Sequence, residues 1–164
     1  MASAFIGLGS NLGNRSAHLL LAQQQLGKLP ETRLLLISQF HETEPLGGPP
    51  QGKFLNAVAH LETRLSPDLL LKHLLEIEEG MFRPPGHPRW EPRTMDLDIL
   101  SYDNVVLRTP KLTIPHPRLH EREFVLLPLS EIAPFWRHPT LGKSALELLK
   151  ELAPRADHPA NISA

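Results

Sequence analysis

Asp96 and Asp98, separated by a single residue, are the side chains of this sequence best suited to chemistry. They lie in "RTMDLDILSY", an apolar run typical of a strand. Successive strand side chains point to opposite faces, so the two carboxylates share one face and Met95, Leu97 and Ile99 share the other. With alpha carbons about 6.5 Å apart, the pair could hold one hard cation or bracket two, as Mg²⁺ chemistry on phosphates requires. The alternative is a solvated edge strand whose charges oppose aggregation.

Three arginines, Arg83, Arg89 and Arg93, precede the aspartates in the proline-rich segment "RPPGHPRWEPR", residues 83–93. Guanidinium groups are planar, permanently charged forks that suit phosphate oxygens. Carboxylates for metal beside arginines for phosphate are the charge arrangement of a nucleotide site, although the arginines could instead balance nearby carboxylates. Trp90 could stack on a planar ring or fill the core.

Other motifs carry less information. The stretch "GLGSNLGN" has GxGxxxG spacing, and no GxxxxGK[ST] occurs, so a tight turn with a helix cap is predicted rather than a phosphate loop. The nine histidines contain no HExxH, so a zinc site is not predicted, and His116 could donate to phosphate. Asn56 could read a heterocycle with its amide or be a satisfied buried amide.

Composition limits the possible classes. A chain of 164 residues is expected to form one domain, here residues 1–153, with a frayed tail at 154–164. With 17 basic and 18 acidic residues, the net charge of −1 gives no general attraction for nucleic acid or membranes. The absence of cysteine excludes disulfides and thiolate chemistry. Without a signal peptide or an apolar run of about 18 residues, the chain is expected to be a soluble cytoplasmic protein. A monomer is also expected.

The elements that must position these residues follow from periodicity and capping signals. Strands are predicted at 3–10, 33–40, 54–63 and 94–102, with a hairpin through 103–108, and helices from Asn14 to Leu29, from Ser66 to Met81, within 112–134 and at 144–152.

The order strand, helix, strand, strand, helix, strand predicts an α+β, ferredoxin-like (split βαβ) antiparallel sheet with helices on one face, in a single domain. In the strand at 54–63, Leu55, Ala57, Ala59 and Leu61 should share one face. Phe54, Asn56, Val58 and His60 should then share the other.

The segments "GLGSNLGN", "TEPLG", "FLNAVAHLET", "RWEPRTMDLDIL" and "LTIPHPRLHEREFVLLPLSEIAP" resemble, in order, the 6-hydroxymethyl-7,8-dihydropterin pyrophosphokinase family, over about residues 4 to 135. The resemblance implies Mg²⁺-dependent transfer of pyrophosphate from ATP to a reduced pterin, with release of AMP, in folate biosynthesis. ATP and the pterin would be the partners, and two Mg²⁺ ions the cofactors.

The resemblance also implies a role for each matching residue. Asp96, Asp98, Arg83 and Arg93 would be catalytic, and the two aspartates would hold the metal ions. The pterin-binding residues would be Thr43, Leu46, Phe54, Asn56 and Phe124, with the two phenylalanines sandwiching the ring. The ATP-binding residues would be Glu78, Trp90, Arg93, Ile99, Lys111, Thr113, His116 and Arg122.

The chain departs from the family pattern at Pro85, Glu91 and Pro117, the first two within the arginine-rich segment. Two alternative functions remain open. One is a ferredoxin-like binding or regulatory module with no metal-dependent nucleotide binding. The other is a metal-dependent phosphohydrolase or nucleotidyltransferase that uses the same carboxylates and needs no pterin.

Overall fold

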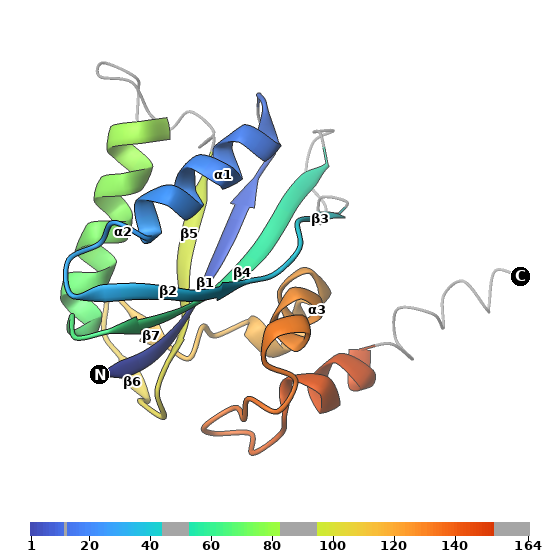
Figure 1. Cartoon of the computed structure of the whole chain (residues 1–164). Helices are drawn as coiled ribbons and strands as arrows, with labels where there is room; N and C mark the ends of the chain where they lie inside the picture. The colour runs from blue at the N-terminus through green and yellow to red at the C-terminus, as the bar shows by residue number, and fades with distance from the viewer. Residues whose placement is uncertain (12, 44–52, 83–94, 153–164) are drawn as a thin grey trace, which may run out of the picture.

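The computed structural model describes residues 1–11, 13–43, 53–82 and 95–152. Its elements, coloured along the chain in Figure 1, are β1 (Ala2–Ser10), α1 (Arg15–Leu26), β2 (Thr32–Ile37), β3 (His41–Thr43), β4 (Phe54–Thr63), α2 (Pro67–Phe82), β5 (Asp96–Tyr102), β6 (Leu107–Arg108), β7 (Thr113–Ile114), the 3-10 helix η1 (Leu119–Glu121) and α3 (Glu123–Ile132). Residues 145–152 are also helical. The predicted frayed tail and the end of the predicted domain fall in 153–164, outside the described residues.

The main sheet is antiparallel, with the strand order β2-β4-β1-β5 and with β3 paired to β4. The central strands β1 and β4 pair along their whole length, from Ala2 opposite Thr63 to Ser10 opposite Leu55. This order, with α1 after β1 and α2 after β4, is the split βαβ arrangement. The predicted ferredoxin-like fold is therefore confirmed.

Helices α1 and α2 cover one face of the sheet, as expected. Helix α1 buries Leu19, Ala22 and Leu26 in one continuous core with Ala57 and Ala59 of β4. The predicted caps are also present. Asn14 Oδ1 accepts from the Ala17 amide at 3.1 Å, and Ser66 Oγ accepts from the Leu69 amide at 3.3 Å.

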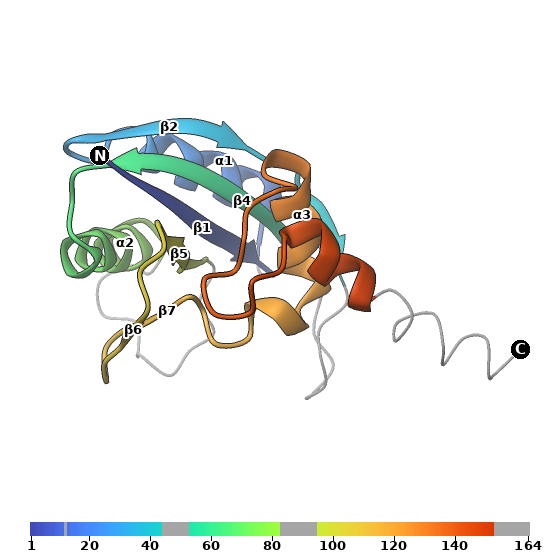
Figure 2. The same ribbon diagram turned by 90° about the horizontal axis from the view of Figure 1, so that it is seen from below.

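Helix α3 covers the opposite face, which corrects the expectation that all helices lie on one face. Phe5, Val58 and Leu100 point away from α1 and form a second core with Leu126 and Leu129 of α3. The two views of Figures 1 and 2 place α3 on the far side of the sheet from α1. The strands therefore carry apolar residues on both faces. In β4, Leu55, Ala57, Ala59 and Leu61 share the face under α1 as predicted, and the other face is largely buried as well.

The predicted hairpin between β5 and residues 105–108 is wrong. The chain does turn at Asp103, whose φ is +48°, but β6 pairs with β7 in a separate two-stranded sheet. The outer edge of β5 is satisfied by other groups, because Leu97 N donates to Glu78 and His116 N donates to the Leu100 carbonyl. This edge therefore has little room for a returning strand.

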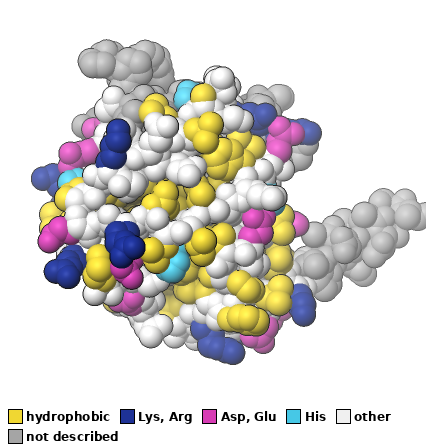
Figure 3. Space-filling model, viewed as in Figure 1, with side chains coloured by type: hydrophobic (Ala, Val, Ile, Leu, Met, Phe, Trp, Pro, Cys, Tyr) yellow, Lys and Arg dark blue, Asp and Glu magenta, His cyan; other side chains and the backbone are white. Residues whose placement is uncertain are grey.

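The helix predicted at 144–152 begins with reciprocal capping, in which Ser144 N donates to Glu147 and Glu147 N donates to Ser144 Oγ. Over the described parts of the chain, no helix has the length and apolarity needed to cross a membrane. On the face shown in Figure 3, basic and acidic side chains are interspersed, in keeping with the near-neutral composition.

Candidate active site

A hollow of about 300 Å³ opens on the α3 side of the sheet, near the ends of β1, β4 and β5. Strand pairing aligns His41, Asn56, Gly9 and Asp96 in one row across β3, β4, β1 and β5. Paired residues on neighbouring strands share a face, so the polar members of this row point to the same side of the sheet. The volume is at the lower end of the range of small-molecule sites.

The two aspartates line this hollow from β5. Both side chains are exposed, whereas Met95, Leu97 and Ile99 are buried in the core under α1 and α2. The predicted segregation of carboxylates and apolar residues to opposite faces of this strand is confirmed.

Gly7 and Gly9 form the floor beside the carboxylates, since Gly7 is paired with Asp98 and Gly9 with Asp96. Both glycines lie inside β1, as the strand predicted at 3–10 requires, and not in the tight turn predicted for the stretch "GLGSNLGN". A Cβ atom on Gly9 would come within 3.0 Å of Asn56 Oδ1. The glycines therefore leave space for the Asn56 side chain and for a ligand. Alternating glycines within a strand pattern are the signal that could have indicated this role.

Besides the carboxylates, the lining of the hollow includes an amide and two aromatic rings. Asn56 is only 6% exposed, and its Nδ2 donates to Thr43 Oγ1 at 2.6 Å. Phe54 of β4 and Phe124 of α3 both line the hollow. The Arg122 guanidinium lies 5.5 Å from the centre of the Phe124 ring, within cation–π range. Aromatic faces and an oriented amide suit a flat, polar heterocycle.

A second hollow, of about 270 Å³, lies at the outer edge of β5. Its wall includes Ile99, Lys111 and Thr113, three of the residues predicted from the resemblance to bind ATP. Asp98 and His116 line both hollows. Asp98 therefore lies where ligands in the two hollows would meet. Leu71 and Pro117 also line this second hollow and were not predicted.

His116 is held in its neutral form at this junction. Burial lowers the pKa of His116 to about 4, and the positive charges of Arg122 and Arg118 add to the effect. Its Nδ1 accepts from the Arg118 amide at 3.2 Å, so the proton of the neutral ring is on Nε2. The ring can therefore donate one hydrogen bond to an anionic ligand.

The free protein should lose stability in mild acid through this histidine. Between the unfolded pKa of about 6.5 and the folded pKa of about 4, the unfolded ring binds a proton that the folded ring does not, so stability falls as the pH is lowered. His116→Gln should reduce the loss between pH 7 and pH 5 by about 1 kcal/mol, a value discounted for solvent screening of this half-buried ring. Urea unfolding at both pH values, in EDTA, measures this, and identical losses in the two proteins would contradict it.

Glu78 lies beneath the carboxylate pair and is not among the lining residues of either hollow. It is 5% exposed, and its Oε2 accepts from the amide of Leu97, the residue between Asp96 and Asp98, at 2.6 Å. This contact fixes the backbone of β5 where the two carboxylates are attached. Direct contact of Glu78 with a nucleotide stays a prediction.

Glu78→Ala should destabilise the protein by about 2–3 kcal/mol, because it leaves a buried amide without its charged acceptor. Glu78→Gln should recover most of that loss, since the amide oxygen can still accept from Leu97. Urea denaturation of both variants, with the exposed neighbour Glu79→Ala as control, measures these effects. Equal, small losses at positions 78 and 79 would contradict the assigned contact.

Four residues predicted for the site, Leu46, Arg83, Trp90 and Arg93, lie outside the described residues, as do the departures Pro85 and Glu91. The structure brings the remaining predicted residues to the two hollows, except Glu78 beneath them. The roles of all of these residues stay predictions.

The donor set suits a magnesium ion that shares its ligands with a substrate. Among the residues that the structure describes, no cluster of three or more His, Asp or Glu side chains could hold a metal. Two neighbouring carboxylates facing a cavity are nevertheless what Mg²⁺ uses beside substrate phosphates, because it keeps its other positions for water and phosphate oxygens. Asp96 and Asp98 therefore fit Mg²⁺ bound together with a polyphosphate.

Comparisons with known proteins agree with this geometry. Residues 5–134 match the family model described as 7,8-dihydro-6-hydroxymethylpterin-pyrophosphokinase (HPPK). A Haemophilus influenzae protein named 2-amino-4-hydroxy-6-hydroxymethyldihydropteridine pyrophosphokinase is 43% identical over 153 residues, which cover 93% of this chain and 94% of that protein. A Pseudomonas aeruginosa protein of the same name is 42% identical over 147 residues, 88% of each chain.

The fold also resembles that of solved structures. Wild-type Plasmodium falciparum HPPK-DHPS with pteroate superposes with a TM-score of 0.77 at 16% sequence identity, over 98% of this chain. The match covers 44% of that longer chain, so the chain corresponds to less than half of it. At this identity the likeness supports the fold alone.

Proposed function

The chain belongs to the 7,8-dihydro-6-hydroxymethylpterin-pyrophosphokinase family and is an enzyme of the transferase class, and from this we propose that it transfers pyrophosphate from ATP to 6-hydroxymethyl-7,8-dihydropterin. The products are AMP and the pterin diphosphate, an intermediate of folate biosynthesis. The reaction depends on two Mg²⁺ ions, and the enzyme acts as a monomer on these small molecules, without nucleic acid or membrane partners.

The position of Asp98 at the junction of two hollows is the observation that carries the proposal. The first hollow offers an amide and two aromatic rings to a pterin, and the second offers apolar side chains and Lys111 to a nucleotide. A carboxylate shared by both lies where the hydroxymethyl group of one substrate would meet the phosphates of the other. A hydrolase would need only one of these hollows.

In the proposed reaction, the hydroxymethyl oxygen of the pterin attacks the β-phosphorus of ATP. A new bond forms between that oxygen and phosphorus, and the bond from the β-phosphorus to the oxygen bridging it to the α-phosphorus breaks. AMP leaves with the bridging oxygen and its electron pair, while the hydroxyl proton is released to solvent. The chain then needs no protein nucleophile, and we expect no dedicated general base.

The residues of the chain act by positioning. Asn56 and Thr43 orient the pterin edge, Phe54 and Phe124 hold its ring, and neutral His116 donates from Nε2 to the triphosphate. Asp96 and Asp98 would hold Mg²⁺, which would neutralise phosphate charge, a contribution that provides much of the acceleration in phosphoryl transfer. Bringing the two substrates together in one orientation supplies most of the rest.

The proposal is tested by following AMP formation from ATP with and without 6-hydroxymethyl-7,8-dihydropterin, in Mg²⁺ and in excess EDTA. AMP that requires both the pterin and the metal is the expected result. Orthophosphate released without pterin would instead indicate a phosphohydrolase. No nucleotide product and no metal-dependent ATP binding, with the fold intact, would favour a non-enzymatic binding module.

A further inference from the structure

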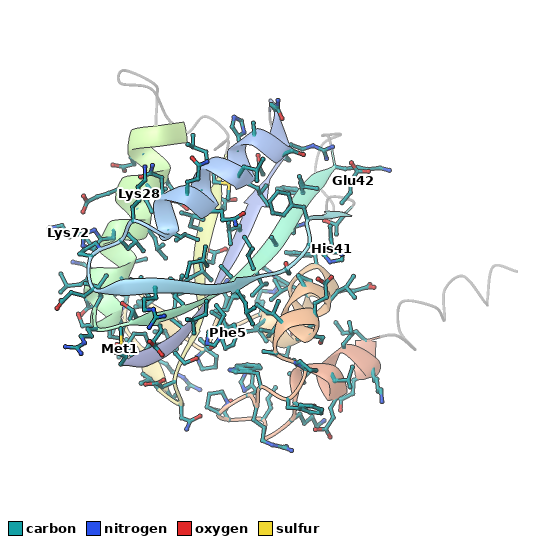
Figure 4. The ribbon with its side chains drawn as sticks, viewed as in Figure 1. Met1, Phe5, Lys28, His41, Glu42 and Lys72 are labelled. Atoms are coloured by element: carbon teal, nitrogen blue, oxygen red, sulfur yellow. The ribbon has the colours of Figure 1, made fainter. Side chains whose placement is uncertain are left out.

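Hydrogen bonds to one carboxylate of α3 link strand β3 to that helix. Glu131, near the C-terminal end of α3, accepts from His41 Nε2 through Oε1 and from the Gln39 amide through Oε2, the latter at 3.1 Å. Both oxygens are engaged by a segment about 90 residues away in the sequence. In Figure 4, His41 lies towards α3 and Glu42 points to the outside. Two hydrogen bonds of the Glu131 carboxylate, from the Gln39 amide and from His41, therefore link helix α3 to strand β3 and the residues just before it. We call this pair of contacts the Glu131 clasp.

The two elements joined by Glu131 both contribute lining residues to the first hollow. Helix α3 contributes Phe124, which precedes Glu131 by seven residues and therefore lies on the same side of the helix two turns away. Strand β3 contributes Thr43, two residues after His41 and on the same face of the sheet. A shift of β3 relative to α3 would change the distance between these two lining residues.

The same strand orients the amide of Asn56. His41 is paired with Asn56 in the ladder between β3 and β4, and Thr43 Oγ1 accepts from Asn56 Nδ2 at 2.6 Å. Since β3 is only three residues long, its ladder with β4 is short. On its other side Glu42 pairs with Arg15 at 2.7 Å, so the strand is held from α1 as well. In the part of the chain that the structure describes, the hydrogen bonds of Glu131 link this strand to the helix that carries Phe124.

We propose that Glu131, acting through His41 and the Gln39 backbone, is a positioning residue that sets the width of the slot between β3–β4 and α3, and thereby the affinity for the flat heterocycle held there. This inference rests on the proposed function, which identifies that heterocycle as a pterin. Glu131 itself is not a lining residue of the hollow, so we expect it to act without contacting the ligand. Its effect should fall on the first hollow, because no residue of β3 or α3 lines the second.

The test compares Glu131→Ala, His41→Ala, their double variant and Glu131→Gln by calorimetric titration with 6-hydroxymethyl-7,8-dihydropterin and, separately, with Mg²⁺ and a non-hydrolysable ATP analogue. Glu131→Ala should raise the pterin Kd about tenfold, the effect of losing a charged hydrogen bond, and leave the nucleotide Kd within about twofold. The double variant should bind the pterin no more weakly than Glu131→Ala, because both residues act through the same hydrogen bond. Glu131→Gln should bind better than Glu131→Ala, since its amide oxygen can still accept from the Gln39 amide.

Glu151→Ala is the matched control, because Glu151 forms an ion pair with Lys143 in the C-terminal segment, away from both hollows. It should change neither Kd. An unchanged pterin Kd in Glu131→Ala, or equal weakening of pterin binding and nucleotide binding, would overturn this inference. In that case pterin binding by the wild-type protein would still uphold the proposed function. Wild-type protein that binds no pterin would overturn both.

Discussion

Asp98→Asn is expected to lower kcat by about a thousandfold or more, the scale of losing a principal charge-stabilising contact in the transition state. Asparagine keeps the shape of the side chain but removes the negative charge that holds a hard cation. Asp98 lines both hollows, so the loss falls where the two substrates would meet. Asp96→Asn should act in the same direction, since Asp96 faces the first hollow from the same strand. Steady-state assays over a range of Mg²⁺ concentrations measure both.

The same substitutions should leave the fold almost unchanged. Both aspartates are exposed, so the free energy of unfolding should change by no more than about 1 kcal/mol. Asp68→Asn, which alters an exposed aspartate at the start of α2, is the control and should keep full activity. A collapse of the melting temperature in Asp96→Asn or Asp98→Asn would show that the pair has a structural role instead.

Asn56→Ala is expected to weaken pterin binding about a hundredfold, because a site built to hydrogen-bond a polar ligand loses 2–3 kcal/mol when a buried partner is removed. The amide is oriented by Thr43 from one side and packs over Gly9 from the other, so no neighbouring group can take its place. The nucleotide Kd should stay within about twofold, since Asn56 lines only the first hollow.

Titration calorimetry with the pterin and with an ATP analogue measures the two affinities separately. Asn56→Ala also removes a buried hydrogen bond, so it should cost about 1–2 kcal/mol of stability, and binding must be measured well below its melting temperature. Equal losses of pterin and nucleotide affinity would count against Asn56 as a pterin contact.

Local patterns in the sequence predicted the sheet and its first helical layer. The ten residues of β4 follow from an apolar run bounded by glycine and proline, and the starts of α1 and α2 follow from Asn14 and from Ser66 with Pro67. Capping and strand alternation depend on residues close together in the chain. Such features can be predicted without knowledge of the tertiary structure.

Features that depend on distant partners were missed. Residues 105–108 were predicted to pair with β5, but Glu78 and the His116 amide already satisfy its outer edge. The packing of α3 against the second face of the sheet depends on Phe5, Val58 and Leu100, which come from three different strands. Pattern within one strand cannot show which residues a distant helix will bury.

Some features of the candidate site likewise follow from local sequence patterns, whereas others depend on contacts between distant residues. The shared face of Asp96 and Asp98 follows from strand alternation, whereas their relation to a heterocycle came from the family resemblance. That Gly7 and Gly9 form the floor, and that Glu131 clasps His41, depends on the register between strands and on helix packing. Neither could be derived from the spacing of residues in the sequence.

The most direct test of the central claim follows the β-phosphate of ATP. With ATP labelled at the β-phosphorus, Mg²⁺ and 6-hydroxymethyl-7,8-dihydropterin, the label should leave the nucleotide together with the γ-phosphate and appear on the pterin, leaving unlabelled AMP. Label retained in ADP would show transfer of the γ-phosphate alone. Label in free pyrophosphate or orthophosphate would show hydrolysis, and either result would contradict pyrophosphate transfer between the two hollows.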